Sequence, residues 1–278
     1  MRIDAHQHFW ALARGDYGWL TPDLAPIYRD FGPDDLHPLL TSHGIDGTVL
    51  VQAAPTAAET RYMLDLAATH DFVLGVVGWA DLEDTDAPDA LAALAREPKL
   101  VGLRPMIQDI ADPDWMLQPA LSPAFEAMSA LGLVFDALTL PKHLPNLRKL
   151  LARHRELRVV IDHISKPRIA AGAFQDWATD IAAIARETTA HVKLSGLVTE
   201  AGDDWTVEDL EPFAAHVLNV FGADRVLWGS DWPVCTLAAT YDQWVAATQS
   251  LLAPLAPGER EAVLGRNAQR LYALKGAR

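Results

Sequence analysis

Short hydrophobic runs recur along the chain and alternate with segments in which apolar residues have helical spacing. Some runs are continuously apolar, as in residues 72–77 (FVLGVV), which suits parallel strands covered by helices better than a half-exposed antiparallel sheet. Strand starts roughly thirty residues apart match the length of a βα unit. The pattern predicts eight strands, over residues 2–8, 47–53, 72–80, 100–107, 132–140, 158–163, 191–197 and 225–230.

The intervening segments carry signals for helices. Ser122 is predicted to be a helix N-cap, with Pro123 at the first helical position and Gly132 as the stop. Further helices are predicted near residues 34–43, 144–156, 173–188 and, as a closing helix, 257–274. Eight strands alternating with helices predict an α/β fold, a (β/α)8 TIM barrel that spans residues 1–278 as a single domain. An open doubly wound sheet is the alternative.

The interval between the first strand and the first helix is unusually long, at about residues 9–33. A loop of this length in a compact domain is usually functional. We therefore expect it to lie over the mouth of the barrel as a lid or substrate wall, with a purely structural Ω-loop as the alternative. Its aromatic residues are Phe9, Trp10, Tyr17, Trp19, Tyr28 and Phe31.

Composition narrows the class of protein. The 278 residues are close to the roughly 250 of a TIM barrel. The net charge of −14 disfavours nucleic acid as a partner, because phosphate binding needs a basic surface. The single cysteine, Cys235, excludes an internal disulfide. Residues 1–6 do not resemble a signal peptide, and no segment reaches the ~20 apolar residues of a membrane span. These features predict a soluble cytoplasmic protein without a membrane partner.

Polar residues mark the end of the first predicted strand. Asp4, His6 and His8 alternate there, so all three are expected to project to one face, at the mouth of the barrel. Two imidazoles at this spacing can hold one metal ion or polarise a carbonyl oxygen. Asp4, one layer deeper, is expected to orient a histidine by a hydrogen bond. The alternative is a pair of ordinary polar residues at a strand end.

Three other strand ends supply ionisable partners, namely Arg104, His163 and Asp231. Arg104 interrupts an apolar strand, where an unpaired charge is costly unless it faces the mouth. Each residue also has a structural alternative: a salt bridge for Arg104, a core position for His163 and a helix cap for Asp231. The convergence of four strand ends favours a shared site.

These motifs together resemble a known family. Residues 4–10 (DAHQHFW), 162–167 (DHISKP) and 229–233 (GSDWP) are similar to the amidohydrolase-2 branch of the amidohydrolase superfamily. The match is to its sugar-lactonase group, which contains L-fuconolactonase and L-rhamnonolactonase. Gln52, Trp79, Arg104 and residues 265–268 (GRNA) also fit that group, so the resemblance spans nearly the whole chain.

The resemblance implies a barrel hydrolase with His6, His8, His163 and Asp231 in the site. It departs from metal-dependent relatives on the fifth strand, which contains no histidine, while His143 lies beyond Pro141. Arg104 cannot be a ligand because it stays protonated. A two-metal centre is therefore not expected. Two alternatives stay open: one Zn²⁺ held by His6, His8 and Asp231, or a site that works without metal.

The implied reaction is hydrolysis of a sugar-acid lactone, an aldonolactone such as L-fuconolactone. Asp231 would take a proton from the attacking water and return it to the leaving hydroxyl. His6, His8, His163 and Arg104 would stabilise the oxyanion, directly or through zinc. The residues expected to bind the sugar are Gln52, Trp79, Lys166, Trp232 and Trp10, although each tryptophan can also fill the core and Lys166 can pair with a carboxylate.

Two competing functions remain at this stage. One is a zinc-dependent decarboxylase of the same branch, which would need a fuller ligand set. The other is a non-catalytic sugar-binding barrel, in which the tryptophans matter and the carboxylate does not. Simple binding has little need of three imidazoles facing one aspartate. The oligomeric state is left open.

Overall fold

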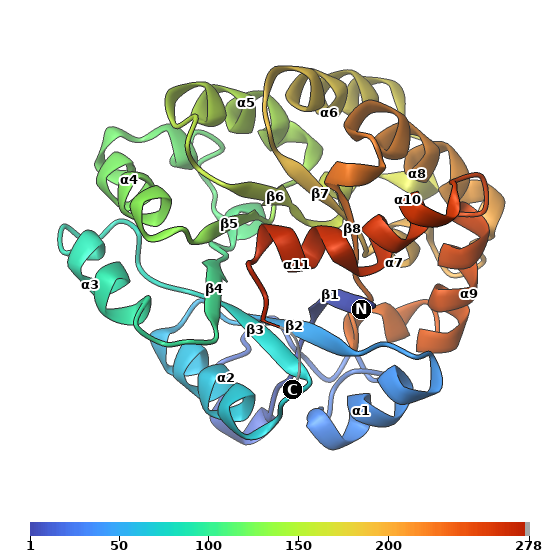
Figure 1. Cartoon of the computed structure of the whole chain (residues 1–278), viewed down its shortest axis with the longest axis horizontal. Coiled ribbons are helices and arrows are strands. Elements are labelled where there is room, and N and C mark those ends of the chain that lie inside the picture. Colours follow the sequence, from blue (N-terminus) through green and yellow to red (C-terminus); the bar gives the residue numbers. More distant parts are fainter. Residues whose placement is uncertain (276–278) are drawn as a thin grey trace.

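The computed structural model describes residues 1–275 and forms a ring of eight parallel strands surrounded by helices (Figure 1). The strands pair in chain order, β1 with β2 through to β7 with β8. This arrangement confirms the predicted (β/α)8 barrel. The strands are β1 (Ile3–Gln7), β2 (Gly47–Val51), β3 (Val73–Gly78), β4 (Leu100–Leu103), β5 (Val134–Ala137), β6 (Val159–Ile161), β7 (His191–Leu194) and β8 (Val226–Trp228).

The ring closes between β1 and the segment that follows β8. Gln7 forms a parallel bridge with Trp232, and the backbone N–H of Asp231 donates to the carbonyl of His6 at 2.8 Å. The N–H of His8 donates to the carbonyl of Trp232 at 2.7 Å. Asp231 is thereby fixed directly beside His6 of β1 and His8 just after it.

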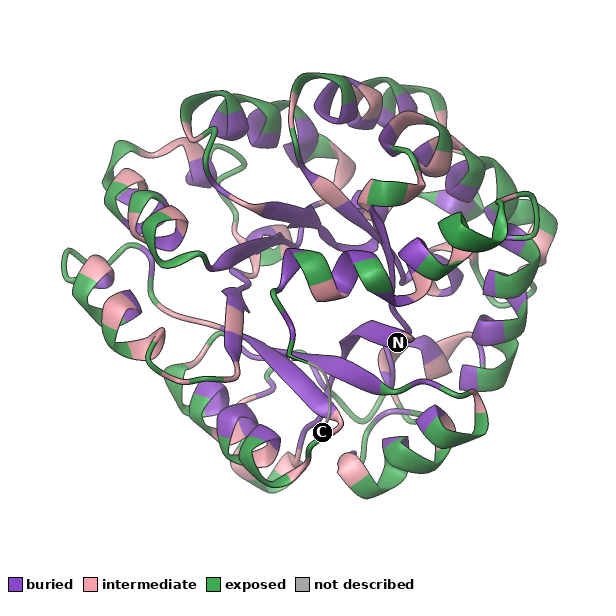
Figure 2. Ribbon diagram, in the orientation of Figure 1, coloured by how far each residue is buried: buried purple, intermediate pink, exposed green. Residues whose placement is uncertain are grey.

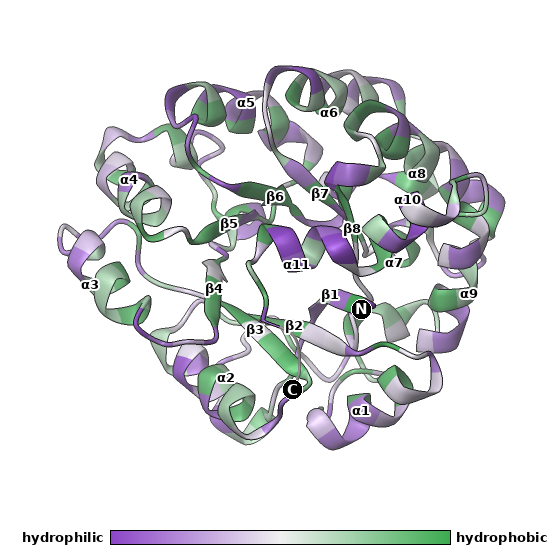
Figure 3. Cartoon of the chain, in the orientation of Figure 1, coloured by the Kyte–Doolittle hydropathy of each residue, from purple (hydrophilic) through white to green (hydrophobic). Residues whose placement is uncertain are grey.

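An outer layer of helices covers the strands, and helices α1 to α9 bury residues on their inner side (Figures 2 and 3). All eight predicted strands are present but shorter than expected, because polar residues at their ends belong to the loops. The helices are α1 (Pro33–Ser42), α2 (Ala57–Thr69), α3 (Ala87–Leu94), α4 (Ser122–Leu131), α5 (Leu144–Arg153), α6 (Gln175–Glu187), α7 (Leu197–Ala201), α8 (Val207–Phe221), α9 (Tyr241–Leu251), α10 (Pro257–Glu261) and α11 (Asn267–Leu271).

Two helix predictions need correction. Ser122 is the first residue of α4 rather than its cap, since a 3-10 turn over Pro119–Leu121 precedes it, although Gly132 ends the helix with φ of 70°. The closing helix expected over residues 257–274 is broken into α10, a π-helical turn (Ala262–Arg266) and α11. The break follows from close packing: a Cβ at Gly265 would lie 2.2 Å from the carbonyl oxygen of Met1.

The expected direction of Asp4 is wrong. The register of β1 against β2 shifts between Asp4 and Gln7, which breaks the simple alternation of side chains. Asp4 consequently accepts hydrogen bonds from the Tyr241 hydroxyl of α9, at 3.1 Å, and from the backbone of Ser230, at 2.8 Å. It fixes the backbone around the site and does not contact a histidine ring.

The bottom of the barrel, at the amino-terminal ends of the strands, is plugged by the end of the chain. Residues of α11 and just beyond it, including Leu271 and Tyr272, pack against the apolar barrel interior of Ile3, Val49 and Val134. In Figure 1 α11 lies across the centre of the ring. No helix within residues 1–275 has the length and apolar character needed to cross a bilayer.

Candidate active site at the barrel mouth

A cavity of about 290 Å³ opens at the carboxyl ends of the strands. This is the end of a TIM barrel where loops assemble active sites. Its walls come from segments far apart in the chain, because parallel strands bring all their carboxyl ends to one face. The lining residues are His8, Trp19, Leu24, Ala53, Arg104, Met106, Gln108, Asp109, Leu138, His163, Lys166, Asp231, Val234 and Leu237.

Three histidines meet one carboxylate at the floor of this cavity. The Oδ1 atom of Asp231 lies 3.3 Å from Nε2 of His8, 3.7 Å from Nε2 of His6 and 3.8 Å from Nε2 of His163. His6 and His8 approach each other to 3.2 Å through their Nε2 atoms. All four residues are at most 4% exposed. The fold therefore brings together the four residues that the motifs single out.

Hydrogen bonds on the far side of two rings orient them. Nδ1 of His8 lies 2.7 Å from the carbonyl oxygen of Val51. A carbonyl only accepts, so this nitrogen carries the hydrogen and Nε2 of neutral His8 presents its lone pair. Nδ1 of His163 lies 2.9 Å from Oγ of Ser195, which can donate or accept.

Unusual backbone geometry presents His163 and Lys166 to the cavity. Four consecutive residues after β6, from His163 to Lys166, have positive φ values of 51°, 47°, 64° and 47°. Such a left-handed turn is unfavourable for non-glycine residues and costs of order 1–3 kcal/mol at each position. Contacts hold it in place: Trp177 donates to the carbonyl of Ile164 at 2.7 Å, and the hydroxyls of Ser165 and Thr139 lie 2.9 Å apart. Strain of this kind clusters at functional sites.

Burial and neighbouring charged groups set the protonation states of the three histidines and Asp231. Burial lowers the pKa of His163 to about 4, and also lowers the pKa values of His6 and His8. For Asp231, burial raises the pKa, but the positive charge that His163, His8 and His6 carry when they are protonated in acid lowers it by more, so its pKa lies below the usual range. At neutral pH the cavity floor therefore presents one carboxylate to three uncharged imidazoles.

Arg104 directly follows β4 and brings positive charge to the same floor. Its side chain is 4% exposed, with Nη1 3.5 Å from Oδ2 of Asp162 and 3.3 Å from Nε2 of His6. Nη2 contacts the carbonyl oxygen of Gln52. Gln52 in turn donates from Nε2 to the carbonyl of Arg104 at 2.6 Å, so it links β2 to β4 and is not among the residues that line the cavity.

A second polar layer lies below this floor, and sequence reasoning missed it. Nζ of Lys193, on β7, lies 2.5 Å from Oδ2 of Asp136 and 3.0 Å from Oδ1 of Asp162. Tyr272 donates to Oδ2 of Asp136 at 2.7 Å. The three charged side chains are completely buried. A charged residue within an apolar strand is the signal that pointed to Arg104, and the same signal could have found Lys193.

The tryptophans expected at the sugar are placed elsewhere. Trp10, Trp79 and Trp232 are not among the cavity-lining residues. Trp10 and Trp232, 1% and 3% exposed, pack edge to face against Phe31 in the core of the loop between β1 and α1. Trp19 of that loop lines the cavity instead, and its Nε1 donates to the carbonyl of Ala53 at 2.7 Å.

Lys166 does reach the cavity, as expected. Its Nζ lies 3.9 Å from Oε1 of Glu200, which is on α7 at the rim. Burial raises the pKa of Glu200, and the charge of Lys166 opposes that shift. The two roles predicted for Lys166, contact with the substrate and pairing with a carboxylate, are therefore compatible with one position.

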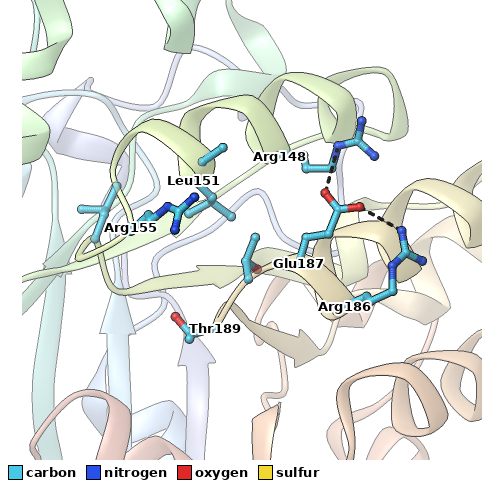
Figure 4. A pocket seen from close by; sticks show the side chains of 9 residues that line it. Arg148, Leu151, Arg155, Arg186, Glu187 and Thr189 are labelled. Carbon is cyan, nitrogen blue, oxygen red and sulfur yellow. Dashed lines mark hydrogen bonds and ion pairs between the residues drawn. The ribbon is translucent and has the colours of Figure 1, made fainter.

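A larger cavity, of about 490 Å³, lies at the opposite end of the barrel between α5 and α6 (Figure 4). Glu187 pairs there with Arg186 at 2.8 Å and Arg148 at 3.7 Å. These side chains are exposed and already paired with one another. Catalysis needs convergent groups shielded from water, which the smaller cavity offers.

The donor set at the mouth suits one metal ion. Nε2 of His6, Nε2 of His8 and Oδ1 of Asp231 are separated by 3.2, 3.3 and 3.7 Å. Bonds of roughly 2.0–2.1 Å in a tetrahedral zinc site place neighbouring ligand atoms about 3.4 Å apart. His6, His163 and Asp231 form a second group, whose ligand atoms all lie within 4.8 Å of one another. His163 thus joins the predicted ligands His6, His8 and Asp231 as a candidate.

Comparisons with known proteins agree with this geometry. A family model described as amidohydrolase matches residues 3–274. An L-fucono-1,5-lactonase from Burkholderia ambifaria is 49% identical over 275 residues, which cover 98% of this chain and 95% of the relative. An L-fucono-1,5-lactonase from Burkholderia multivorans is 35% identical over 99% of this chain and 96% of its own length.

Solved structures give the same result. The crystal structure of an amidohydrolase from Burkholderia multivorans has a TM-score of 0.93 and 34% identity, and covers 99% of this chain and 100% of its own. A second crystal form of that amidohydrolase, with the same score and identity, contains bound zinc.

Proposed function

We propose that this chain, which belongs to the amidohydrolase family, is a hydrolase that opens the lactone ring of a sugar acid by attack of water on the ring carbonyl. The observation that carries the proposal is the single carboxylate of Asp231 among three neutral imidazoles, in a chain 49% identical to an L-fucono-1,5-lactonase. Among the reactions predicted from sequence, lactone hydrolysis is the one that these relatives share.

Asp231 is the general base in this reaction. Its carboxylate takes a proton from water as the water oxygen forms a bond to the lactone carbonyl carbon. The bond between that carbon and the ring oxygen then breaks, and Asp231 returns the proton to the leaving hydroxyl. Because its pKa lies low, Asp231 is a weak base, which suffices for an ester carbonyl that is more electrophilic than that of an amide.

Arg104 and His163 face the oxygen that becomes negative during the attack. Both line the cavity next to Asp231, and both are about 3% exposed, so their interaction with the oxyanion is little screened by water. Neutral His8 presents a lone pair at Nε2 and cannot donate to an oxyanion. Its expected role as an oxyanion donor is therefore replaced by that of an acceptor or a ligand.

Zinc fits this site without being needed to write the steps above. When held by Asp231 and His6, with His8 or His163 as the third ligand, the ion would act as a Lewis acid on the carbonyl oxygen. The predicted single-metal site thus stays compatible with the donor set.

The cavity suits a small ring with one apolar side. Trp19, Leu24, Met106 and Leu138 form apolar wall, while Gln108, Asp109 and Lys166 supply groups for sugar hydroxyls. Aromatic rings commonly pack against apolar faces of ligands, with a polar edge fixed by a hydrogen bond, as the Trp19 indole is here. We therefore assign sugar binding chiefly to Trp19 and Lys166. A cytoplasmic location stays a prediction.

A pH-indicator screen of aldonolactones, run with and without a chelator, tests the proposal. Ring opening gives a carboxylic acid that releases a proton, and we expect the fastest release with a six-carbon 1,5-lactone such as L-fucono-1,5-lactone. Proton release no faster than that of the Asp231→Asn variant on every lactone would overturn the proposal. Release of CO₂ from an aromatic acid, lost with chelator and restored by zinc, would instead identify the decarboxylase alternative.

A further inference from the structure

Lys193 occupies a position that the proposed mechanism does not use. Its side chain is completely buried inside the barrel, below the cavity floor. The ammonium contacts three groups: Oδ2 of Asp136 at 2.5 Å, Oδ1 of Asp162 at 3.0 Å and Nδ1 of His6 at 3.1 Å. An ammonium has three N–H donors and no acceptor. The contact with Oδ1 of Asp162 is an ion pair and not a hydrogen bond. Because an ammonium cannot accept, Nδ1 of His6 is the acceptor in its hydrogen bond with Lys193, so the hydrogen of this neutral ring is on Nε2.

The contacts on the cavity side lead independently to the same assignment. Nε2 of His8 presents a lone pair, because its Nδ1 hydrogen is donated to Val51. Oδ1 of Asp231 can only accept. These two acceptors lie 3.2 and 3.7 Å from Nε2 of His6, and 3.3 Å from each other. A hydrogen on Nε2 of His6 can be donated to Nε2 of His8 at 3.2 Å, whereas Oδ1 of Asp231, at 3.7 Å, lies beyond hydrogen-bond distance.

Arg104 also approaches this nitrogen, with Nη1 at 3.3 Å. Its guanidinium has other acceptors, however, because Nη1 lies 3.5 Å from Oδ2 of Asp162 and Nη2 contacts the carbonyl of Gln52. The contact with His6 is therefore not needed to satisfy Arg104.

We propose that Lys193 is a positioning residue that holds His6 with its hydrogen on Nε2 and thereby favours the metal-free form of the site. The hydrogen and a zinc ion are alternatives for the same place, since both would lie between His6, His8 and Asp231. The inference rests on the proposed function, because it gives His6 the task of holding His8, which lies 3.3 Å from the general base Asp231.

Metal binding through Nε2 of His6 would require the hydrogen to move to Nδ1. There it would face an N–H of Lys193 at 3.1 Å, with Oδ1 of Asp162, at 3.4 Å, as the acceptor within reach. Lys193 thus opposes the form of His6 that a metal needs. With a neutral residue at this position, Oδ1 of Asp162, which accepts no hydrogen bond here, could accept from Nδ1 without the opposing ammonium.

Nitrogen-15 NMR of metal-free protein labelled at histidine tests the assignment directly. The His6 signals are identified by their loss in the His6→Gln variant. We expect the protonated nitrogen of His6 to be Nε2. A hydrogen on Nδ1 in the wild-type protein would overturn the proposal. This measurement needs no variant at Lys193, so it decides even if such a variant fails to fold.

Zinc affinity, measured by competition with a chromophoric chelator, provides the second test. Because Lys193→Met alone would leave the buried Asp136 carboxylate without its cation, the variant is Lys193→Met combined with Asp136→Asn. We expect the His6 hydrogen to move to Nδ1 and zinc to bind about 10- to 100-fold more tightly, the range seen when groups next to metal ligands are changed.

Two matched variants separate the ammonium from other effects. Asp136→Asn alone keeps Lys193 and should leave zinc affinity near that of the wild type. Lys99→Met removes a lysine that donates to the carbonyl of Val73 at 2.6 Å, remote from the mouth, and should have no effect. Equal or weaker zinc binding in the double variant would overturn the proposal. Neither readout uses a lactone, so failure of the proposed function would be seen separately.

Discussion

One cavity with an arginine lies at the mouth of the barrel, and another with several arginines lies between α5 and α6 at the opposite end. The two cavities differ in how far their charged side chains are buried. At the mouth, Arg104 is buried beside the carboxylate of Asp162 and lines, with Asp231, a space of about 290 Å³. At the bottom, Arg148 and Arg186 are exposed around Glu187, in a space of about 490 Å³. An exposed ion pair contributes little energy because water screens it. The cavity suited to catalysis is therefore the one whose charged groups converge and are shielded from water, although it has the smaller volume.

Each end of the barrel also has a histidine whose pKa is lowered by burial to about 4. The two histidines differ in the charged groups that surround them. His163 at the mouth has the carboxylates of Asp231 and Asp162, which oppose the shift. His191 at the start of β7 has the cations of Arg270, Arg225 and Arg158, which add to it. A lowered pKa alone thus does not identify a catalytic group; the acceptor beside His163 does.

The largest expected difference between the two ends concerns their carboxylates. Asp231→Asn should lower kcat by about 10²- to 10⁴-fold, because the amide cannot accept the proton of water. Glu187→Gln at the bottom should leave kcat unchanged. Steady-state lactone hydrolysis by both variants measures the contrast. Wild-type turnover by Asp231→Asn would remove the general base from the mechanism.

The arginines should differ by a smaller factor. Arg104→Met removes a buried positive charge at the position of the oxyanion and should lower kcat/KM by roughly 10²- to 10³-fold. Arg155→Met, in the wall of the bottom cavity, should have no effect on turnover. Thermal melting run in parallel shows whether each variant keeps its fold. Equal kinetics in two folded variants would contradict the role of Arg104.

Two glycines offer a matched pair of substitutions. Gly196 after β7 and Gly222 before β8 have φ of 66° and 72°, so alanine should cost about 1 kcal/mol of stability at either position. At Gly196, however, the new Cβ would lie 2.6 Å from Nδ1 of His163, whereas at Gly222 it would meet open space. Displacement of His163 should lower kcat roughly 10- to 100-fold in Gly196→Ala only. Similar kcat values would show that the exact position of His163 is unimportant.

His191 should affect stability and leave turnover unchanged. Its pKa of about 4 in the folded protein lies below the ordinary 6.5, so the unfolded chain binds an extra proton between these values. The free energy of unfolding therefore falls as pH falls from 6.5 to 4. His191→Gln should reduce the loss between pH 7 and pH 5 by about 1 to 2 kcal/mol. Urea unfolding at both pH values measures it, and an unchanged difference would refute the assignment.

Much of the barrel and part of its site could be predicted from sequence. Apolar runs at regular spacing predict eight strands, because buried parallel strands need continuous hydrophobic stretches. His6, Arg104, His163 and Asp231 could be grouped because the carboxyl ends of such strands share one face. This reasoning needs only the chain order and the side-chain chemistry.

Other features depend on contacts that local pattern does not contain. A register shift in β1 turns Asp4 outward, against the simple alternation of a strand. The long loop buries Trp10 and presents Trp19, a choice made by packing against Phe31 and Ala53. The closing helix breaks where Gly265 meets Met1.

The sequence by itself determined which chemistry is available, and the tertiary structure decided which atoms face one another. Lys193 reads as one charged residue in a short strand, yet its partners lie 57 and 187 positions away. Only closure of the barrel brings its ammonium to Nδ1 of His6 and so decides which nitrogen of that ring faces Asp231. The physical reason is that hydrogen bonds depend on distance and direction at the scale of an ångström, and long-range folding sets both.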